Sequence, residues 1–192
     1  MADWTAVTLT EARQVLEMIG GIEDEDALPP PEVTVRAHYD ALRRAGPTAE
    51  AVTFLGQALP RFEAVAWGAR ILDEESRRVD LPRRDRQALD TTLRWLHDPD
   101  EAHRRAARAA ADAAGRRSPE CYLALAAFYS GGSIVDLDLP PTPPPPHASG
   151  RFVTGAVTQA AWRVPDAGRV FERALALGEQ VAERGFVAAW PA

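Results

Sequence analysis

The sequence predicts an all-α protein in which about nine antiparallel helices form one compact domain, residues 1–192. Apolar residues recur every three or four positions through most of the chain, which is the period of an amphipathic helix. No run of β-branched residues alternates with polar ones over the length of a strand. Most connections are short, and short connections favour antiparallel neighbours. The composition, 46% hydrophobic and 26% charged, is that of a globular protein with a sizeable core.

The first third of the chain holds three predicted helices. The first begins at Thr8, which stands at capping-box spacing from Glu11, and it ends at Gly20. The acidic, proline-rich segment IEDEDALPPP follows and predicts a loop. A second helix, EVTVRAHYDALRRAG, stops at Gly46, and the short third helix is TAEAVTFLGQAL.

The middle of the chain predicts three more helices. One begins at Pro60, because proline is tolerated in the first turn, and the next is LPRRDRQALDTTLRWLHD. The third, DPDEAHRRAARAAADAAG, takes Asp98 as its cap and Glu101 to close the capping box. Its many alanines allow other helices to approach closely. We therefore expect it to lie between neighbours, with its arginines facing outward.

The last third opens with the helix SPECYLALAAFYSGG, whose Ser118 caps it and whose Pro119 occupies the first position. After a proline-rich segment come SGRFVTGAVTQAAWRV and DAGRVFERALALGEQVAERG. Tryptophans also mark the core. Trp67, Trp95 and Trp162 fall inside amphipathic helices and are expected in it, and the two tryptophans near the chain ends should tie those ends down, Trp4 and Trp190.

Residues 131–149 form the segment that we call the strap. Six prolines lie between Leu139 and His147, and such a run is stiff and has no internal hydrogen bonds. As a linker it would isolate a tail of two helices, which is too small to fold comfortably alone. As a ligand it would suit an SH3-like groove. We predict a strap across the surface of one domain, with Leu137 and Leu139 docked into the helical body.

The charge is unevenly distributed. All 22 basic residues are arginine and the net charge is −6. Residues 1–60 carry ten acids and four arginines, whereas residues 77–117 carry eleven arginines and seven acids. The arginines alternate with acids and no aromatic stacking pattern accompanies them, which argues against nucleic acid. We expect a solvated, ion-paired surface, with Arg83, Arg84 and Arg86 as candidates for contact with an acidic protein partner.

The SGGS turn, Ser130, Gly131, Gly132 and Ser133, is the candidate for small-ligand binding. Phosphate-binding turns precede a helix, so that backbone amides face the anion. This turn follows a helix instead, where glycine supplies a positive φ for the helix end. A small-ligand binder or enzyme that uses the cleft beside the turn is the alternative function.

The segment HDPDEAH brings His97, Asp98, Asp100, Glu101 and His103 close together in sequence. Two of these residues are already accounted for as helix caps, and the arrangement is not the HExxH zinc motif. The sequence therefore predicts no metal site and no cofactor.

The sequence gives little support for a catalytic reaction that uses a nucleophilic side chain. Cys121 is a lone thiol among apolar residues, which is typical of core packing, and a single cysteine excludes an intrachain disulfide. His38 and His147 lie in no recognisable motif, so no catalytic residue is assigned. The chain lacks a signal peptide and any apolar run of about 20 residues, which favours a cytoplasmic protein without membrane insertion.

Four segments share their order and spacing with one known family. They are EAVTFLGQALPRFEAVAW, WLHDPDEAHRRAARAAADAAG, SPECYLALAAFYSGGS and PPTPPPPHASGRFVTGAVTQAA. On these segments, over roughly residues 48–180, the chain resembles a family of small bacterial proteins of unknown function. Ala66 is a departure, since members often carry tryptophan there.

This resemblance implies an accessory, non-enzymatic role in a multiprotein bacterial system, because members are often encoded near type VI secretion components. It brings no mechanism and no catalytic residues. The leading hypothesis is therefore a non-catalytic interaction or adaptor protein that binds another protein.

Overall fold

The structure is a computed structural model that describes residues 4–20 and 28–190. These ranges are helical and contain no strand beyond one isolated bridge, so the all-α prediction is confirmed. The four-residue α10 is not predicted by the sequence. In chain order the helices are α1 (Ala12–Ile19), α2 (Val35–Arg44), α3 (Ala49–Ala58), α4 (Arg61–Ser76), α5 (Arg83–His97), α6 (Glu101–Ala113), α7 (Pro119–Phe128), α8 (Ala148–Trp162), α9 (Ala167–Arg184) and α10 (Phe186–Ala189).

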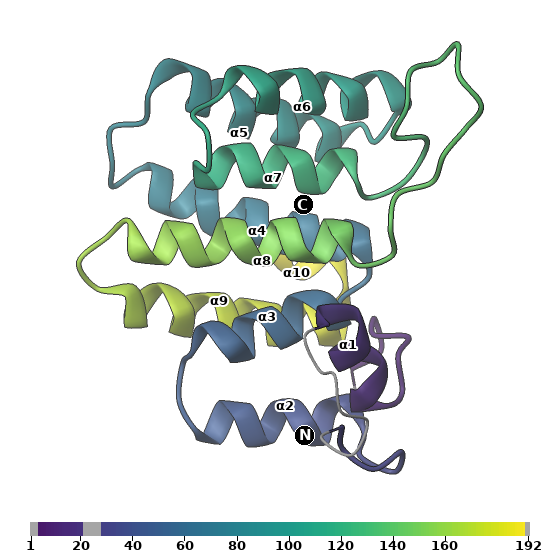
Figure 1. Ribbon diagram of the computed structural model, residues 1–192. Coiled ribbons are helices and arrows are strands. Elements are labelled where there is room, and N and C mark those ends of the chain that lie inside the picture. Colours follow the sequence, from purple (N-terminus) through teal and green to yellow (C-terminus); the bar gives the residue numbers. More distant parts are fainter. Residues whose placement is uncertain (1–3, 21–27, 191–192) are drawn as a thin grey trace.

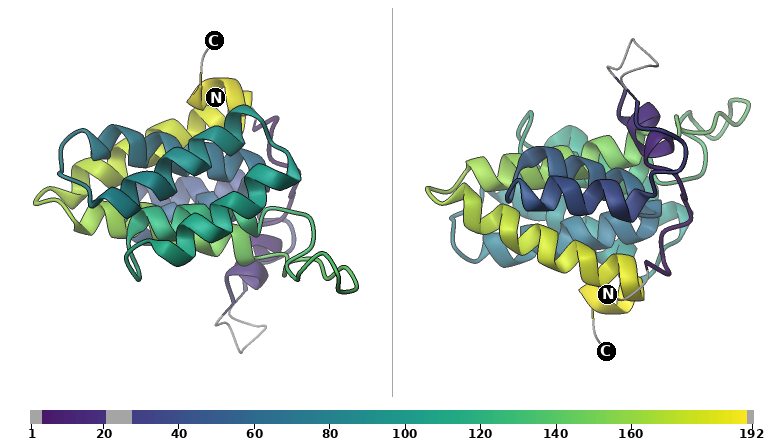
Figure 2. Two further views of the ribbon diagram at one scale, coloured as in Figure 1. Left: turned by 90° about the horizontal axis from the view of Figure 1, so that it is seen from above. Right: turned by 90° about the horizontal axis from the view of Figure 1, so that it is seen from below.

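From α2 to α9, successive helices run in opposite directions, so their connections lie at two ends of the bundle (Figure 1). The α4–α5, α6–α7 and α8–α9 connections share one end, which we call the turn end. The long α7–α8 connection leaves the opposite end, which we call the loop end. Both views in Figure 2 show the same arrangement. The predicted loop before α2 falls partly on residues 21–27, which lie outside the described residues.

Side-chain caps explain where most helices begin. The hydroxyl of Thr34 accepts a hydrogen bond from the backbone of α2, Thr48 does so for α3, and Ser118 does so for α7. Asp166 caps α9 in the same way. Each cap satisfies one of the backbone N–H groups that a helix start leaves without a partner. The predicted start of α7 at Ser118 and Pro119 is confirmed.

Two predicted helix starts are wrong. The helix expected from Thr8 begins at Ala12, where Glu11 and Gln14 form the capping box. The helix expected to be capped by Asp98 is capped by Asp100, whose carboxylate accepts from the His103 amide at 2.7 Å. In both cases a polar residue stands a few positions nearer the helix, and spacing alone did not rank the two candidates.

The core closes around Trp67, which is fully buried and donates its indole N–H to the Ala174 carbonyl at 2.8 Å. Two glycines let α3 and α9 approach this ring. A β-carbon at Gly56 would lie 2.3 Å from Thr154, and one at Gly178 would lie 2.4 Å from Leu55. Close helix contact in the centre therefore depends on the absence of side chains at these two positions.

The remaining tryptophans divide between the core and the surface. Trp95 is buried as predicted. Trp4 is also buried, and its ring packs 4.9 Å from that of Tyr39. Trp190 donates to the Ala66 carbonyl at 3.1 Å, so both end tryptophans contact the body. Trp162, predicted to be in the core, is 66% exposed, which corrects that expectation.

Candidate interaction site

The strap leaves the helical body at the loop end and projects from it (Figures 1 and 2). Leu137 is 79% exposed and Leu139 is 51% exposed, so the prediction that they dock into the body is wrong. The backbone of Ile134 donates to the Thr142 carbonyl at 2.9 Å, and this bond closes the loop on itself before the leucines are reached. We call residues 135–141 the loop tip.

The backbone around the loop tip is held by several further hydrogen bonds. Ser133 Oγ accepts from the amides of Thr142 and Val135, at 3.1 and 3.4 Å. Within the tip, the Leu139 amide donates to the Asp136 carbonyl at 3.1 Å. On the return path, Pro144 is buried against the body. The tip is thus a preformed loop, and less conformational entropy is lost when a preformed loop binds a partner.

Arg104 of α6 holds the strap to the end of α7. Its side chain is only 5% exposed, and it donates to the carbonyl of Phe128 and, at 2.7 Å, to that of Ser133. The guanidinium also lies 4.7 Å from the centre of the Phe128 ring. Glu101, one turn earlier on α6, accepts two hydrogen bonds from it at 2.7 and 2.8 Å. The expectation that the arginines of this helix face outward is therefore wrong for Arg104.

Arg105, the next residue of α6, also binds the backbone of the strap. It donates to the Val135 carbonyl at 3.0 Å and to Glu101 at 2.7 Å. The hydrogen bond from Arg104, followed by that from Arg105, lowers the pKa of the Glu101 carboxyl. One acid therefore orients two arginines, and together these three residues fix where the loop tip begins. The sequence signal was an acid three and four positions before a pair of arginines, a spacing that also occurs on ordinary helix surfaces.

The SGGS turn serves the fold, as its place after a helix suggested. Gly132 has φ 63°, and a β-carbon there would lie 2.8 Å from Arg104 Nη2. Ser130 donates its hydroxyl to Ala127 and accepts at its carbonyl from Arg61, at 2.8 and 3.3 Å. Gly131 has open space around it. A left-handed conformation beside a packed guanidinium accounts for glycine at position 132.

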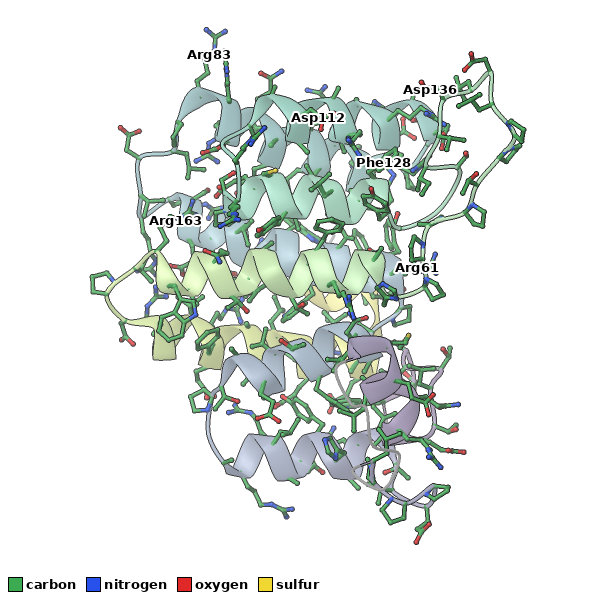
Figure 3. The ribbon with its side chains drawn as sticks, viewed as in Figure 1. Arg61, Arg83, Asp112, Phe128, Asp136 and Arg163 are labelled. Carbon is green, nitrogen blue, oxygen red and sulfur yellow. The ribbon has the colours of Figure 1, made fainter. Side chains whose placement is uncertain are left out.

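A hollow of about 350 Å³ does lie beside this turn, between α6 and the strap. Asp112, Phe128 and Asp136, which are labelled in Figure 3, are among the residues that line it. Arg108 donates to both carboxylate oxygens of Asp112, at 2.9 and 3.0 Å, and its guanidinium also lies 5.5 Å from the centre of the Phe128 ring. Of the charged groups that line the hollow, Arg105, Arg108 and Asp112 thus already have partners, whereas the Asp136 carboxylate forms no hydrogen bond or ion pair within the described residues.

At the turn end, Arg83 and Arg84 are exposed, and within the described residues their guanidinium groups form no hydrogen bond or ion pair. Arg86 differs from them. It is half-buried and donates to the hydroxyl and carbonyl of Ser76, at 3.1 and 3.3 Å. Of the three arginines named from the sequence, the structure therefore leaves two free for contact and gives the third a structural role.

Asp85 brings another exposed pair of arginines to the same end. Its buried carboxylate accepts from the Gly115 amide at 2.8 Å and from the Ser118 hydroxyl at 3.0 Å. These bonds hold the first turn of α5 against the α6–α7 connection. We call Arg83, Arg84, Arg116 and Arg117 the arginine group; all four are exposed, and none forms an ion pair within the described ranges.

In the acidic segment before α6, only some of the side chains that are close in sequence also lie close together in space. Asp98, Asp100 and His103 offer ligand atoms within 4.8 Å of one another, while His97 is not part of the group. His103 Nδ1 lies 3.0 Å from the Asp98 carbonyl and 3.2 Å from the Asp100 carboxylate. The tautomer with its proton on Nδ1 would satisfy both acceptors and would leave Nδ1 without a lone pair for a metal. Helix capping accounts for this arrangement.

This interpretation predicts different results for two substitutions. Asp100→Ala should lower the free energy of unfolding by about 1 kcal/mol, whereas Asp100→Asn, which can still cap, should stay close to the wild type. Chelator treatment should leave the melting temperature unchanged. Urea titrations with and without EDTA measure all three. Equal losses for both variants, together with a loss in EDTA, would instead assign the carboxylate to a metal.

The possible nucleophile is not activated. Burial raises the pKa of the Cys121 thiol, which donates to the Ala111 carbonyl at 3.4 Å. Buried thiols of this kind are inert. Burial also lowers the pKa of His38, whose ring packs 4.7 Å from that of Phe54. Among the described residues, His103 is the histidine whose ring forms a hydrogen bond, and that bond serves the helix start.

With the geometry established, comparison with known proteins adds one finding. The model of a family of unknown function, DUF6931, matches residues 38–182, which is most of the chain. The chain belongs to this family. The DUF6931 match includes α3 to α8, the strap and the arginine group. No curated protein and no solved structure matches this DUF6931 chain. None of its described helices is long and apolar enough to cross a membrane.

Proposed function

We propose that this DUF6931 protein is a non-catalytic interaction protein that presents the loop tip to a protein partner. The observation that carries the proposal is the exposure of Leu137 and Leu139 on a loop whose backbone is already fixed. Large apolar side chains at such exposure gain about 2 kcal/mol each when a partner buries them. A preformed loop loses little conformational entropy on binding, so this gain contributes directly to affinity.

The order of residues in the tip defines the partner's chemistry. Asp136, Leu137, Asp138 and Leu139 alternate acid and apolar side chains, and two prolines follow immediately. The matching surface is an apolar pocket with basic groups around its rim. Apolar contact in the pocket would supply affinity, and charge on the rim would supply orientation and association rate.

The proposed setting is a multiprotein bacterial assembly of the type VI secretion kind, in which this chain acts as an accessory adaptor. The support is the resemblance of its tryptophan, SGGS and polyproline segments to family members encoded near such components. The raised pKa of the buried Cys121 thiol fits that role, because an adaptor needs a binding surface and no reaction centre.

Capture from native lysate with matched variants tests the proposal. We compare the wild type, Leu137→Ser with Leu139→Ser, and the control Val187→Ser. Val187 is 63% exposed on α10, so its loss removes a comparable surface group elsewhere. A partner should be recovered by the wild type and the control and be missing with the double variant. The purified partner should then bind the double variant at least about tenfold more weakly.

All three proteins should melt alike, because the leucines are exposed in the free protein. If the double variant binds every recovered partner as tightly as the wild type, the loop tip is not the binding element and the proposal fails.

A further inference from the structure

We infer that the loop tip also binds the turn end of a second copy of this chain, so that the protein self-associates head to tail. This inference rests on the proposed function, since it names a partner for the same loop. The two ends of the bundle expose apolar side chains, and they carry charges of opposite sign that form no ion pair within the described residues.

Three of the four large exposed hydrophobic side chains that the structure describes lie at these two ends. The large hydrophobic residues exposed in the described ranges are Leu137, Leu139, Trp162 and Val187. The two leucines belong to the loop tip. Trp162 is the last residue of α8 and lies at the turn end, where its ring meets that of Phe171 edge-on at 5.7 Å. Tryptophan is the residue type most enriched among interface anchors, and it is well suited to contact leucine and proline.

Trp162 belongs to the same end as the arginine group. The next residue, Arg163, donates to both oxygens of Glu120 in the first turn of α7, at 2.8 and 3.1 Å. That turn follows Arg116 and Arg117 directly. Figure 3 shows Arg83 and Arg163 at this end and Asp136 at the other.

The charges of the two ends are complementary. The loop tip carries Asp136 and Asp138, both exposed and without an ion pair within the described residues. The turn end carries the arginine group, whose four guanidinium groups form no ion pair within the described residues. Contact between them would pair these charges while the leucines cover Trp162. Such complementarity raises association rates and fixes orientation.

One copy cannot make this contact with itself. The fifteen residues of α8 alone separate the two ends by about 22 Å. The contact therefore joins two different surfaces on two copies, which is a heterologous interface. Repetition of such an interface gives rings or open chains and is not limited to dimers.

Sedimentation of the full chain over a range of protein concentrations tests the inference. The mean mass should rise with concentration at about 0.01 M salt and rise less at about 0.15 M, because the Debye length falls from about 30 to about 8 Å. Trp162→Ala should weaken the association at both salt concentrations. A protein that stays monomeric at the highest concentration in low salt would overturn the inference.

A charge-swap experiment identifies the surfaces. The end variant is Arg83→Glu, Arg84→Glu and Arg116→Glu; Arg117 is kept because its φ is 66°. The tip variant is Asp136→Arg and Asp138→Arg. Each alone should associate at least about tenfold more weakly than the wild type, since like charges now meet. An equimolar mixture should regain association, because each variant offers the charge that the other lacks.

Non-specific attraction does not explain recovery in the mixture. The wild type has a net charge of −6, so both variants remain net negative and repel each other overall. The control pair Arg44→Glu with Arg94→Glu changes exposed arginines outside the group and should associate like the wild type. If the mixture stays monomeric, the inference fails. Loop-dependent capture of another protein would still stand, so the two proposals fail independently.

Discussion

Arg104→Met is expected to lower the free energy of unfolding by about 3 kcal/mol. The substitution keeps much of the side-chain volume but removes every donor. The carbonyls of Phe128 and Ser133 then lose a charged partner in a largely buried position, and each such loss costs about 1–3 kcal/mol. The packing of the guanidinium on the Phe128 ring is lost as well. Urea denaturation measures the change.

The neighbouring Arg105→Met is the matched control. Arg105 is more exposed and holds the same segment from outside, so its loss should cost about 1 kcal/mol. Arg104→Met should also make the loop tip easier to cleave by a non-specific protease, because the Ser133 carbonyl at the base of the tip loses its hydrogen bond to α6. Equal unfolding energies for the two variants would show that Arg104 does not hold the strap.

Glu120→Ala is expected to cost about 3 kcal/mol. Glu120 is fully buried and accepts two hydrogen bonds from Arg163, so its removal leaves a cation facing an apolar cavity. Breaking a buried pair in this way is commonly destabilising by about 3–5 kcal/mol. The lower value applies because Arg163 keeps 25% of its side chain in solvent.

The double variant Glu120→Leu with Arg163→Met separates the pair from its surroundings. Removing both charges together should recover most of the loss, since no unpaired ion remains. A double-mutant cycle from urea titrations gives the coupling between the two residues. A coupling near zero would mean that the pair contributes nothing beyond the volume of its side chains.

Helix positions follow from local sequence because caps and apolar periods act over a few residues. The start of α7 shows this, since Ser118 and Pro119 leave no competing choice. The start of α1 shows the limit, since Thr8 and Glu11 both fit a capping pattern. The backbone prefers Glu11 because Ala12 donates to the Val33 carbonyl, a contact with a distant segment that spacing does not contain.

Side-chain burial was harder to predict than helix position. Trp67 and Trp162 both follow apolar periods, yet one is at the centre and the other is exposed. Trp162 is the last residue of its helix, where the Phe171 ring contacts it edge-on and the rest of the side chain stays in solvent. Leu137 and Leu139 were misplaced for a related reason. The hydrogen bond that closes the loop joins Ile134 to Thr142, and the proline-rich sequence contains no pattern that predicts this bond.

The sequence predicted only part of the candidate interaction surfaces. The stretch of residues 77–117 stood out by charge, but composition did not distinguish Arg83, which has no partner among the described residues, from Arg86, which binds Ser76. Arg104 was placed on the wrong side because its partners are backbone carbonyls of the α7–α8 connection. Those partners are set by the packing of α6 on α7 and not by the sequence around Arg104.

The closure between Ile134 and Thr142 has a consequence for how this fold can change over time. Apart from the bonds to the backbone of Val135, the contacts described above that hold the strap to the bundle lie on one side of that bond, and the loop tip lies on the other. Substitutions, or insertions beyond Val135, leave Arg104, Gly132 and Pro144 in place, so the length and chemistry of the tip can vary at little cost in folding. A single scaffold can in this way acquire different binding partners by exchanging seven residues, 135–141.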